Sequence, residues 1–209
     1  MNIMAAGESA VEFIERPSGV DLEGASNILV LVESLDDAAR ESYYGTLLPE
    51  DPSSVDVLAV DYRRTPEEYL EEWRQYVDER PRRCGIVCVD GAARSSGDGS
   101  EVGPGAVATV ESPTDLTGLG ITVGNYLESN GGSDTIVTFD SLTMLLQYVE
   151  CERAFRFLGV LSNRVEETDA VAHYHMDPKA HDDREMATLS SLFDAIARFD
   201  DGEWNVRRR

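Results

Sequence analysis

Short apolar runs alternate with segments of helical periodicity along most of this chain, and no other sequence feature constrains the fold as strongly. Continuous apolar runs of strand length predict five buried strands, at residues 27–32, 55–62, 85–89, 135–139 and 170–175. Between them, helical spacing of apolar residues predicts amphipathic helices. Buried strands that alternate with such helices form a mostly parallel, twisted sheet with helices on both faces.

The boundaries of several elements follow from local signals. A helix is expected over residues 36–48 after the N-cap candidate Ser34, and another from Thr65, with a proline in its first turn. A short strand is expected at 107–110, followed by a helix that ends near Leu127. Further helical segments are expected at 144–149, 154–161 and 186–197, and a closing strand at 204–207.

The length of 209 residues suits one α/β domain, which we assign to residues 26–209. Residues 1–25 show little periodicity and are expected to be a loosely ordered lead-in, with an edge strand at 11–14. Residues 95–105 are rich in glycine and serine and predict a flexible loop.

The charge of the chain limits its partners. The formal net charge is −22, and one lysine stands against 17 arginines. Such a surface repels nucleic-acid phosphate and anionic membranes at low salt, so neither is expected as a partner. The combination is typical of salt-in halophilic archaea, in which molar salt screens the charge and acidic residues keep the protein hydrated. No targeting or membrane-spanning pattern is present, and we expect a cytoplasmic protein.

The three cysteines do not predict a disulfide framework. Cys84 and Cys88 lie four residues apart on one side of a predicted strand, and Cys151 is distant from them. Buried free thiols are the favoured interpretation. A zinc half-site at Cys84 and Cys88 is the alternative, although no second pair stands at suitable spacing.

A phosphate-binding loop of the GxxxxGK[ST] type is absent from the position where an α/β nucleotide site needs it. The stretch after the first strand, residues 33–40, has no glycine and carries several carboxylates. The sole lysine, Lys179, lies far downstream, so no side chain here can serve as the lysine that reaches the β- and γ-phosphates.

The block from Asp134 to Val149 resembles the second nucleotide motif of RecA-like ATPases of the KaiC and RadA kind, in which an apolar strand ends in Asp-Ser and a helix follows. The segments 113–120, 155–158, 171–175 and 175–182 extend the similarity. Leu192-Phe193-Asp194 would then precede a terminal hairpin. From about residue 25 onward the chain resembles a haloarchaeal family of RecA-like domains, which implies a RecA-like three-layer α/β fold.

The resemblance also implies roles for individual residues. In an active relative the aspartate at position 140 would hold the Mg²⁺ shell, and a glutamate after the third strand would polarise water; here that region reads Asp90 to Arg94. With the phosphate loop absent, Asp140 and Ser141 are vestigial candidates for cofactor binding. The favoured interpretation of Asp140 is that it caps the helix that opens near Leu142, and a ligand role is the alternative. No cofactor is expected, although weak ATP binding stays open.

All three histidines lie within nine residues, as His173, His175 and His181, with Asp177 between them. On a strand, His173 and His175 project to the same face, where Asp177 or His181 could complete a metal site. The favoured interpretation is a polar cleft rim at the carboxyl edge of the sheet, so no metal is expected.

The sequence therefore predicts a non-catalytic RecA-like domain that works through protein contacts, in a regulatory or signalling role, with a protein partner or as a homo-oligomer. No catalytic constellation of serine, cysteine or lysine with a base can be identified. The alternative is an enzyme or sensor that binds a ligand or metal in the cleft near Asp140, His173, His175 and Asp177.

Overall fold

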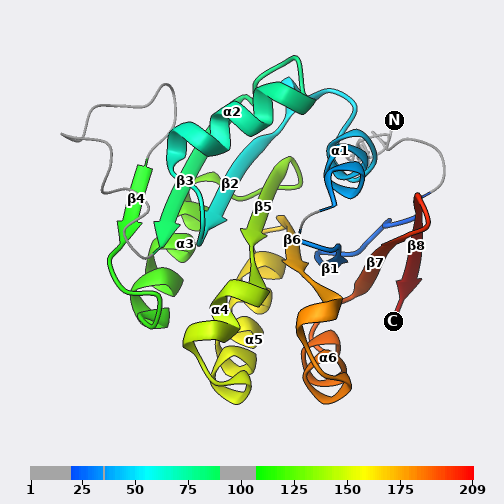
Figure 1. Cartoon of the computed structure of the whole chain (residues 1–209). Helices are drawn as coiled ribbons and strands as arrows, with labels where there is room; N and C mark the ends of the chain where they lie inside the picture. The colour runs from blue at the N-terminus through cyan, green and yellow to red at the C-terminus, as the bar shows by residue number, and fades with distance from the viewer. Residues whose placement is uncertain (1–19, 35, 90–106) are drawn as a thin grey trace, which may run out of the picture.

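The sheet of this protein has eight strands in the order β4-β3-β2-β5-β6-β1-β7-β8 (Figure 1). The structure is a computed structural model that describes residues 20–34, 36–89 and 107–209. Every neighbouring pair runs parallel except β7 and β8, which form an antiparallel hairpin. The strands are β1 (Asn27–Leu31), β2 (Asp56–Asp61), β3 (Arg83–Val89), β4 (Val107–Val110), β5 (Thr135–Asp140), β6 (Val171–Met176), β7 (Ala195–Asp200) and β8 (Glu203–Arg208).

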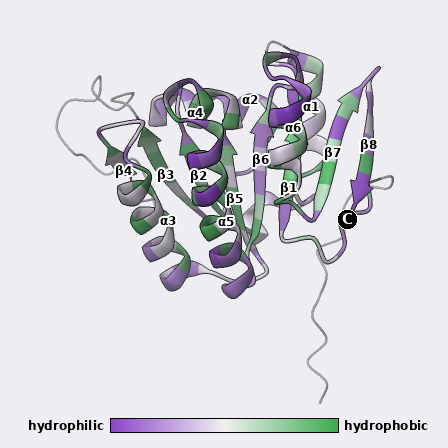
Figure 2. Cartoon of the chain, turned by 90° about the horizontal axis from the view of Figure 1, so that it is seen from below, coloured by the Kyte–Doolittle hydropathy of each residue, from purple (hydrophilic) through white to green (hydrophobic). Residues whose placement is uncertain are grey.

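Helices cover both faces of this sheet, as the alternation in the sequence predicts (Figures 1 and 2). One face carries α1 and α2, and the other carries α3 to α6. The helices are α1 (Asp37–Thr46), α2 (Pro66–Tyr76), α3 (Leu116–Asn130), α4 (Leu142–Tyr148), α5 (Cys151–Glu167) and α6 (Asp183–Ser190).

The core lies in two layers, one on each side of the sheet, because successive side chains of a strand point to opposite faces. In β1, Ile28 and Val30 pack toward α1 and α2, whereas Leu29 and Leu31 pack toward the other four helices. All five residues of β1 are buried, which explains why this strand reads as a continuous apolar run instead of an alternating one.

One predicted helix is wrong over much of its length. Helical spacing predicted a helix over residues 186–197, but α6 ends at Ser190 and Ala195 begins β7. Ala195 and Ala197 pack into the α1–α2 layer and Ile196 into the opposite layer, as in a strand. β7 pairs with β1 on one side and β8 on the other. Tertiary pairing therefore overrides a short helical pattern, and the terminal hairpin implied by the resemblance is present.

The chain before β1 is more tightly attached than its composition predicted. Val20, Leu22 and Ala25 are buried and pack with the α1–α2 layer, so residues 20–25 belong to the domain. The expected edge strand at 11–14 and the expected loop at 95–105 both lie outside the described residues.

The closing strand predicted at 204–207 is present as β8, and it extends into the final arginines. Arg207 and Arg208 belong to β8, and the backbone N–H of Arg209 donates a 2.9 Å hydrogen bond to the carbonyl of Asp194.

Cys84 and Cys88 lie on the same side of β3, against the α1–α2 layer, as predicted. Both are free thiols. Burial raises the pKa of Cys84 to about 12 and that of Cys88 to about 11, so both are protonated at neutral pH.

Candidate functional site

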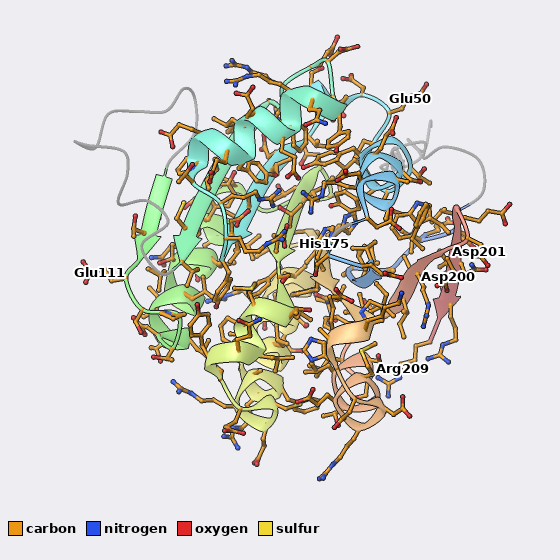
Figure 3. All side chains as sticks on the ribbon, viewed as in Figure 1. Glu50, Glu111, His175, Asp200, Asp201 and Arg209 are labelled. Carbon is orange, nitrogen blue, oxygen red and sulfur yellow. The ribbon has the colours of Figure 1, made fainter. Side chains whose placement is uncertain are left out.

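The carboxyl ends of β1, β2, β5 and β6 meet at one edge of the sheet and enclose a cavity of about 60 Å³. This is the edge at which parallel α/β sheets bind their ligands. Side chains from the segments that follow all four strands line the cavity, and α1 and α2 close it from one side. His175, at the end of β6, lies near the middle of the molecule in this region (Figure 3).

Two carboxylates lie side by side at the ends of neighbouring strands. Asp61 closes β2, Asp140 closes β5, and the two residues are partners in the sheet register. The side chain of Arg64 joins them: its Nε donates to Asp61 at 2.6 Å, and its Nη2 donates to Asp140 at 2.7 Å. Because the Asp61 side chain is 0% exposed, this guanidinium supplies the charge that makes its burial tolerable.

Both carboxylate oxygens of Asp140 are occupied by arginines. Nη2 of Arg63 donates to each oxygen at 3.0 Å, and Arg64 bonds the second oxygen as well. Burial alone would raise the pKa of Asp140, but the guanidiniums of Arg64 and Arg63 outweigh it and hold that pKa below the ordinary value. The side chain is therefore an ionised carboxylate whose counter-charges come from its own chain.

Asp61 is held by backbone groups as well. Its Oδ1 accepts from the N–H of Arg63 at 2.8 Å and from the N–H of Arg64 at 2.7 Å. Burial still raises the pKa of Asp61, although Arg64 opposes the shift.

A third carboxylate, Glu72 of α2, completes the network. It accepts from Nη1 of Arg40 at 2.9 Å, from Nη1 of Arg64, and from the hydroxyl of Tyr44 at 3.2 Å. Three arginines (Arg40, Arg63, Arg64) and three carboxylates (Asp61, Glu72, Asp140) thus form a cluster with a formal charge of zero. The charges in this cluster are balanced without any added ion.

Two backbone N–H groups near the start of α1 already donate to carboxylates. At the start of α1, the side chain of Asp36 accepts from the N–H of Ala39 at 3.0 Å. Just upstream, the N–H of Ser34 donates to the carboxylate of Asp177 at 3.0 Å. The N-cap of α1 is therefore Asp36 and not Ser34 as the sequence predicted. Carboxylates of the protein therefore accept N–H groups near the start of α1 that an anionic ligand would need.

His173 and His175 do project to the same face of β6, as the strand geometry predicted, and both contact Tyr43. Nδ1 of His173 lies 3.0 Å from the Tyr43 hydroxyl, and the ring of His175 packs edge-on against Tyr43 with 4.5 Å between centroids. His173 is fully buried, whereas His175 lines the cavity. Withdrawal from water lowers the pKa of His175 to about 4, against the pull of Asp140, so the imidazole is neutral at neutral pH.

His181 lies apart from the other two histidines. Its Nδ1 is 3.1 Å from Glu185 and its Nε2 is 3.1 Å from the hydroxyl of Thr143. In the described part of the chain, no three histidine, cysteine, aspartate or glutamate side chains are arranged to hold a metal ion. Of the four metal candidates, His175 and Asp177 share the cavity, and His173 and His181 do not line it.

The predicted cap role of Asp140 is wrong. Ser141 is the N-cap of α4, and its hydroxyl accepts from the N–H of Met144 at 3.2 Å. Asp140 is turned instead toward Arg63 and Arg64, which outcompete a neutral N–H donor for a carboxylate. The peptide bond between Asp140 and Ser141 is cis.

Four residues predicted from the sequence line the cavity: Asp140, Ser141, His175 and Asp177. The three arginines and Glu72 of the cluster were not predicted. The available signal was the segment Asp61-Tyr62-Arg63-Arg64, in which a buried strand ends in an acid and two arginines follow. Had β2 been placed beside β5, those guanidiniums would have been expected to meet Asp140.

Comparisons with known proteins identify the fold and a family. The sequence pattern of a family of unknown function, DUF7504, matches residues 25–199. No curated protein matches the chain. None of the helices in the described residues combines the length and apolar character needed to cross a membrane.

Two solved structures from archaea are similar to this one. The flagellar accessory protein FlaH from Methanocaldococcus jannaschii is 14% identical, with 87% of this chain and 75% of that chain covered and a TM-score of 0.49. The protein PH0250 from Pyrococcus horikoshii OT3 is 14% identical, with 88% and 86% covered and a TM-score of 0.55. The fold is the RecA-like three-layer α/β arrangement, with its mostly parallel sheet and helices on both faces.

Proposed function

Because the chain belongs to the DUF7504 family, whose function is unknown, we propose a function from its own site: a non-catalytic RecA-like domain that works through protein contacts in a regulatory role. One observation carries the proposal. Arg63 and Arg64 occupy both oxygens of Asp140, the carboxylate that would hold Mg²⁺ in an active relative.

The residues at the site do not fit a magnesium nucleotide. The cavity of about 60 Å³ is far below the several hundred Å³ of typical ligand sites. The Ala39 and Ser34 N–H groups already donate to Asp36 and Asp177, and the rim adds those carboxylates to an internally neutral cluster. Phosphoryl transfer relies on positioning and on stabilising developing negative charge, and carboxylates at the phosphate position oppose both.

A stable charge cluster has a structural use in such a domain. It ties together the segments after β2 and β5 and the helices α1 and α2 without a bound nucleotide. A RecA-like domain of this kind can keep one conformation and present its outer surfaces to a partner. We also propose that the protein works in the cytoplasm of a halophilic organism.

The assay for this proposal is ATP hydrolysis in molar KCl with Mg²⁺. We expect no turnover above background and no rise in melting temperature on addition of ATP. Mg²⁺-dependent turnover by the wild-type chain that Asp140→Asn abolishes would refute the proposal, because it would show that Asp140 serves a metal and not the arginines.

A sensor for a small ligand is the second candidate, because His175, Asp140 and Asp177 line an enclosed space next to the ring of Tyr43. The volume limits such a ligand to the size of a few water molecules. Native mass spectrometry of the protein purified in high salt separates the two functions. A bound small molecule lost in His175→Phe would favour the sensor, and an unliganded mass would favour the first proposal.

A further inference from the structure

The outer face of α3 and α5 carries the two most exposed large apolar side chains of the described residues. Val160 is 71% exposed and Ile121 is 59% exposed, and they lie on neighbouring helices of the same layer (Figure 2). Phe157 lies in the groove between them, which has a volume of about 650 Å³. We call this surface the α3–α5 face. Clustered apolar groups on an otherwise acidic surface indicate a contact site.

Two glycines keep the groove open. A Cβ at Gly120 would lie 3.5 Å from the ring of Phe157, and one at Gly124 would lie 3.7 Å from Nε of Arg164. Side chains at these positions would therefore cover the apolar floor. The absence of side chains at Gly120 and Gly124 leaves part of the Phe157 side chain accessible from outside.

The charges around the groove balance, unlike those of the chain as a whole. The chain has a net charge of −22. Three arginines line the groove, Arg153, Arg156 and Arg164. Beside it are the glutamates that pair with two of them, Glu152 with Arg156 and Glu128 and Glu167 with Arg164. Their formal charges sum to zero, and five of the six take part in ion pairs with one another.

We propose that the α3–α5 face is where two copies of this chain meet across a twofold axis. In a twofold interface the same patch faces itself, so it must be self-complementary. An apolar centre with equal numbers of both charges meets that requirement. A purely acidic or basic face does not, because it would repel its own copy. Two chains that each carry a charge of −22 repel each other least when they approach through a part of the surface that is neutral.

This inference deepens the proposed function, since it names the partner as a second copy. The proposed function and the proposed dimer can fail independently. The hydrolysis assay tests the cavity, whereas the oligomeric state tests a different surface. The groove lies on α3 and α5, whereas the cavity is closed by α1 and α2 and the strand ends.

Light scattering after size exclusion, over a concentration series in molar KCl, tests the proposal. We expect the wild-type chain to be a dimer. Val160→Glu should raise the dimer dissociation constant at least about tenfold, because it places a charge at the centre of the contact. Ile121→Glu, on the other helix, should act in the same direction.

Asn163→Glu is the matched control. Asn163 is exposed on α5 but does not line the groove. The substitution therefore adds the same charge as Val160→Glu to the same helix, but outside the contact. It should leave the dissociation constant within about threefold of the wild-type value, since rim charges contribute little to affinity. Circular dichroism confirms that each variant is folded.

A wild-type chain that stays monomeric at all concentrations would overturn the proposal. The α3–α5 face would then not be a contact between two copies, and a different protein could be its partner. So would a dimer that survives both groove substitutions unchanged, because its interface would then lie elsewhere.

Discussion

Arg64 is the residue on which the charge cluster depends most. It contacts three carboxylates at once, and its own side chain is only 14% exposed. Asp61 and Asp140 lie side by side in the register, so without Arg64 they would repel each other away from water. The pKa of Arg64 is raised above its ordinary value, since the pull of Asp140, Asp61 and Glu72 exceeds the opposing effect of burial.

Arg64→Ala should lower the free energy of unfolding by roughly 3–5 kcal/mol, because it leaves buried carboxylates without their partner. Arg74→Ala is the control. Arg74 is 51% exposed and lies 3.7 Å from Glu71, so its removal should change stability by less than about 1 kcal/mol. Chemical denaturation in molar KCl measures both. Equal effects of the two substitutions would contradict the central role of Arg64.

His175 should make stability depend on pH in a defined direction. Its pKa in the native state is about 4, below the value of about 6.5 for an unfolded histidine. Between these values the unfolded chain binds a proton that the native chain does not, so protonation favours unfolding. The contribution of His175 is therefore present above about pH 6.5 and is lost as the pH falls toward 4.

The comparison of His175→Gln with the wild-type chain isolates this effect. The difference in unfolding free energy between them should become less favourable to the wild type as the pH is lowered from about 7 to about 5. Denaturation curves at fixed molar KCl across this range provide the measurement. If the two stabilities run parallel, the imidazole is not withdrawn from water as the cavity geometry indicates.

The sequence predicted Asp140 and residues at the end of β6 as site candidates, but it did not indicate which side chains they contact. The Asp-Ser pair is a local pattern, whereas the Arg63–Asp140 and Arg64–Asp140 contacts join residues 77 and 76 positions apart. Only the neighbour relation of β2 and β5 brings them together.

Elements that combine several local signals were predicted best. The helix α2 begins at Pro66, one residue after its predicted start, and Thr65 and Glu68 form a reciprocal capping box there. The buried strands were found within a residue or two of their bounds. The wrong assignment fell on β7, where small residues fit either periodicity and the decision depends on pairing with β1 and β8.

Ser141 provides a prediction at the level of a single element. Since the Ser141 hydroxyl caps α4, Ser141→Ala should lower the free energy of unfolding by about 1 kcal/mol. Ser141→Thr keeps a hydroxyl at this position and should retain most of the capping contribution. Asp140→Ala should lower the free energy of unfolding by more than Ser141→Ala, because it removes the carboxylate that pairs with Arg63 and one of the three that pair with Arg64. Thermal denaturation distinguishes these cases, and the reverse order would return the capping role to Asp140.

For the whole molecule, net charge sets the conditions under which the fold persists. A formal charge of −22 leaves most carboxylates without a basic partner, and they repel one another in the native state. The Debye length is about 3 Å in molar salt and about 10 Å at 0.1 M, so the repulsion grows as salt is removed.

We therefore expect the protein to lose structure on dialysis from molar KCl to about 0.05 M. Circular dichroism and the sharpness of the thermal transition report the loss. A fully folded protein with a cooperative transition at low salt would contradict the halophilic interpretation, and the acidity would then need a different explanation, such as a basic partner.

Arg63 and Arg64 provide the positive charge beside Asp140 from within the chain, and this has a further consequence. A metal ion reaches its site by diffusion, so its occupancy falls on dilution and a chelator can remove it. Arg63 and Arg64 are tethered to Asp140 by the chain itself, at a local concentration that dilution does not change. The state of this edge is therefore fixed when the chain folds, and it should be the same in EDTA as in excess magnesium.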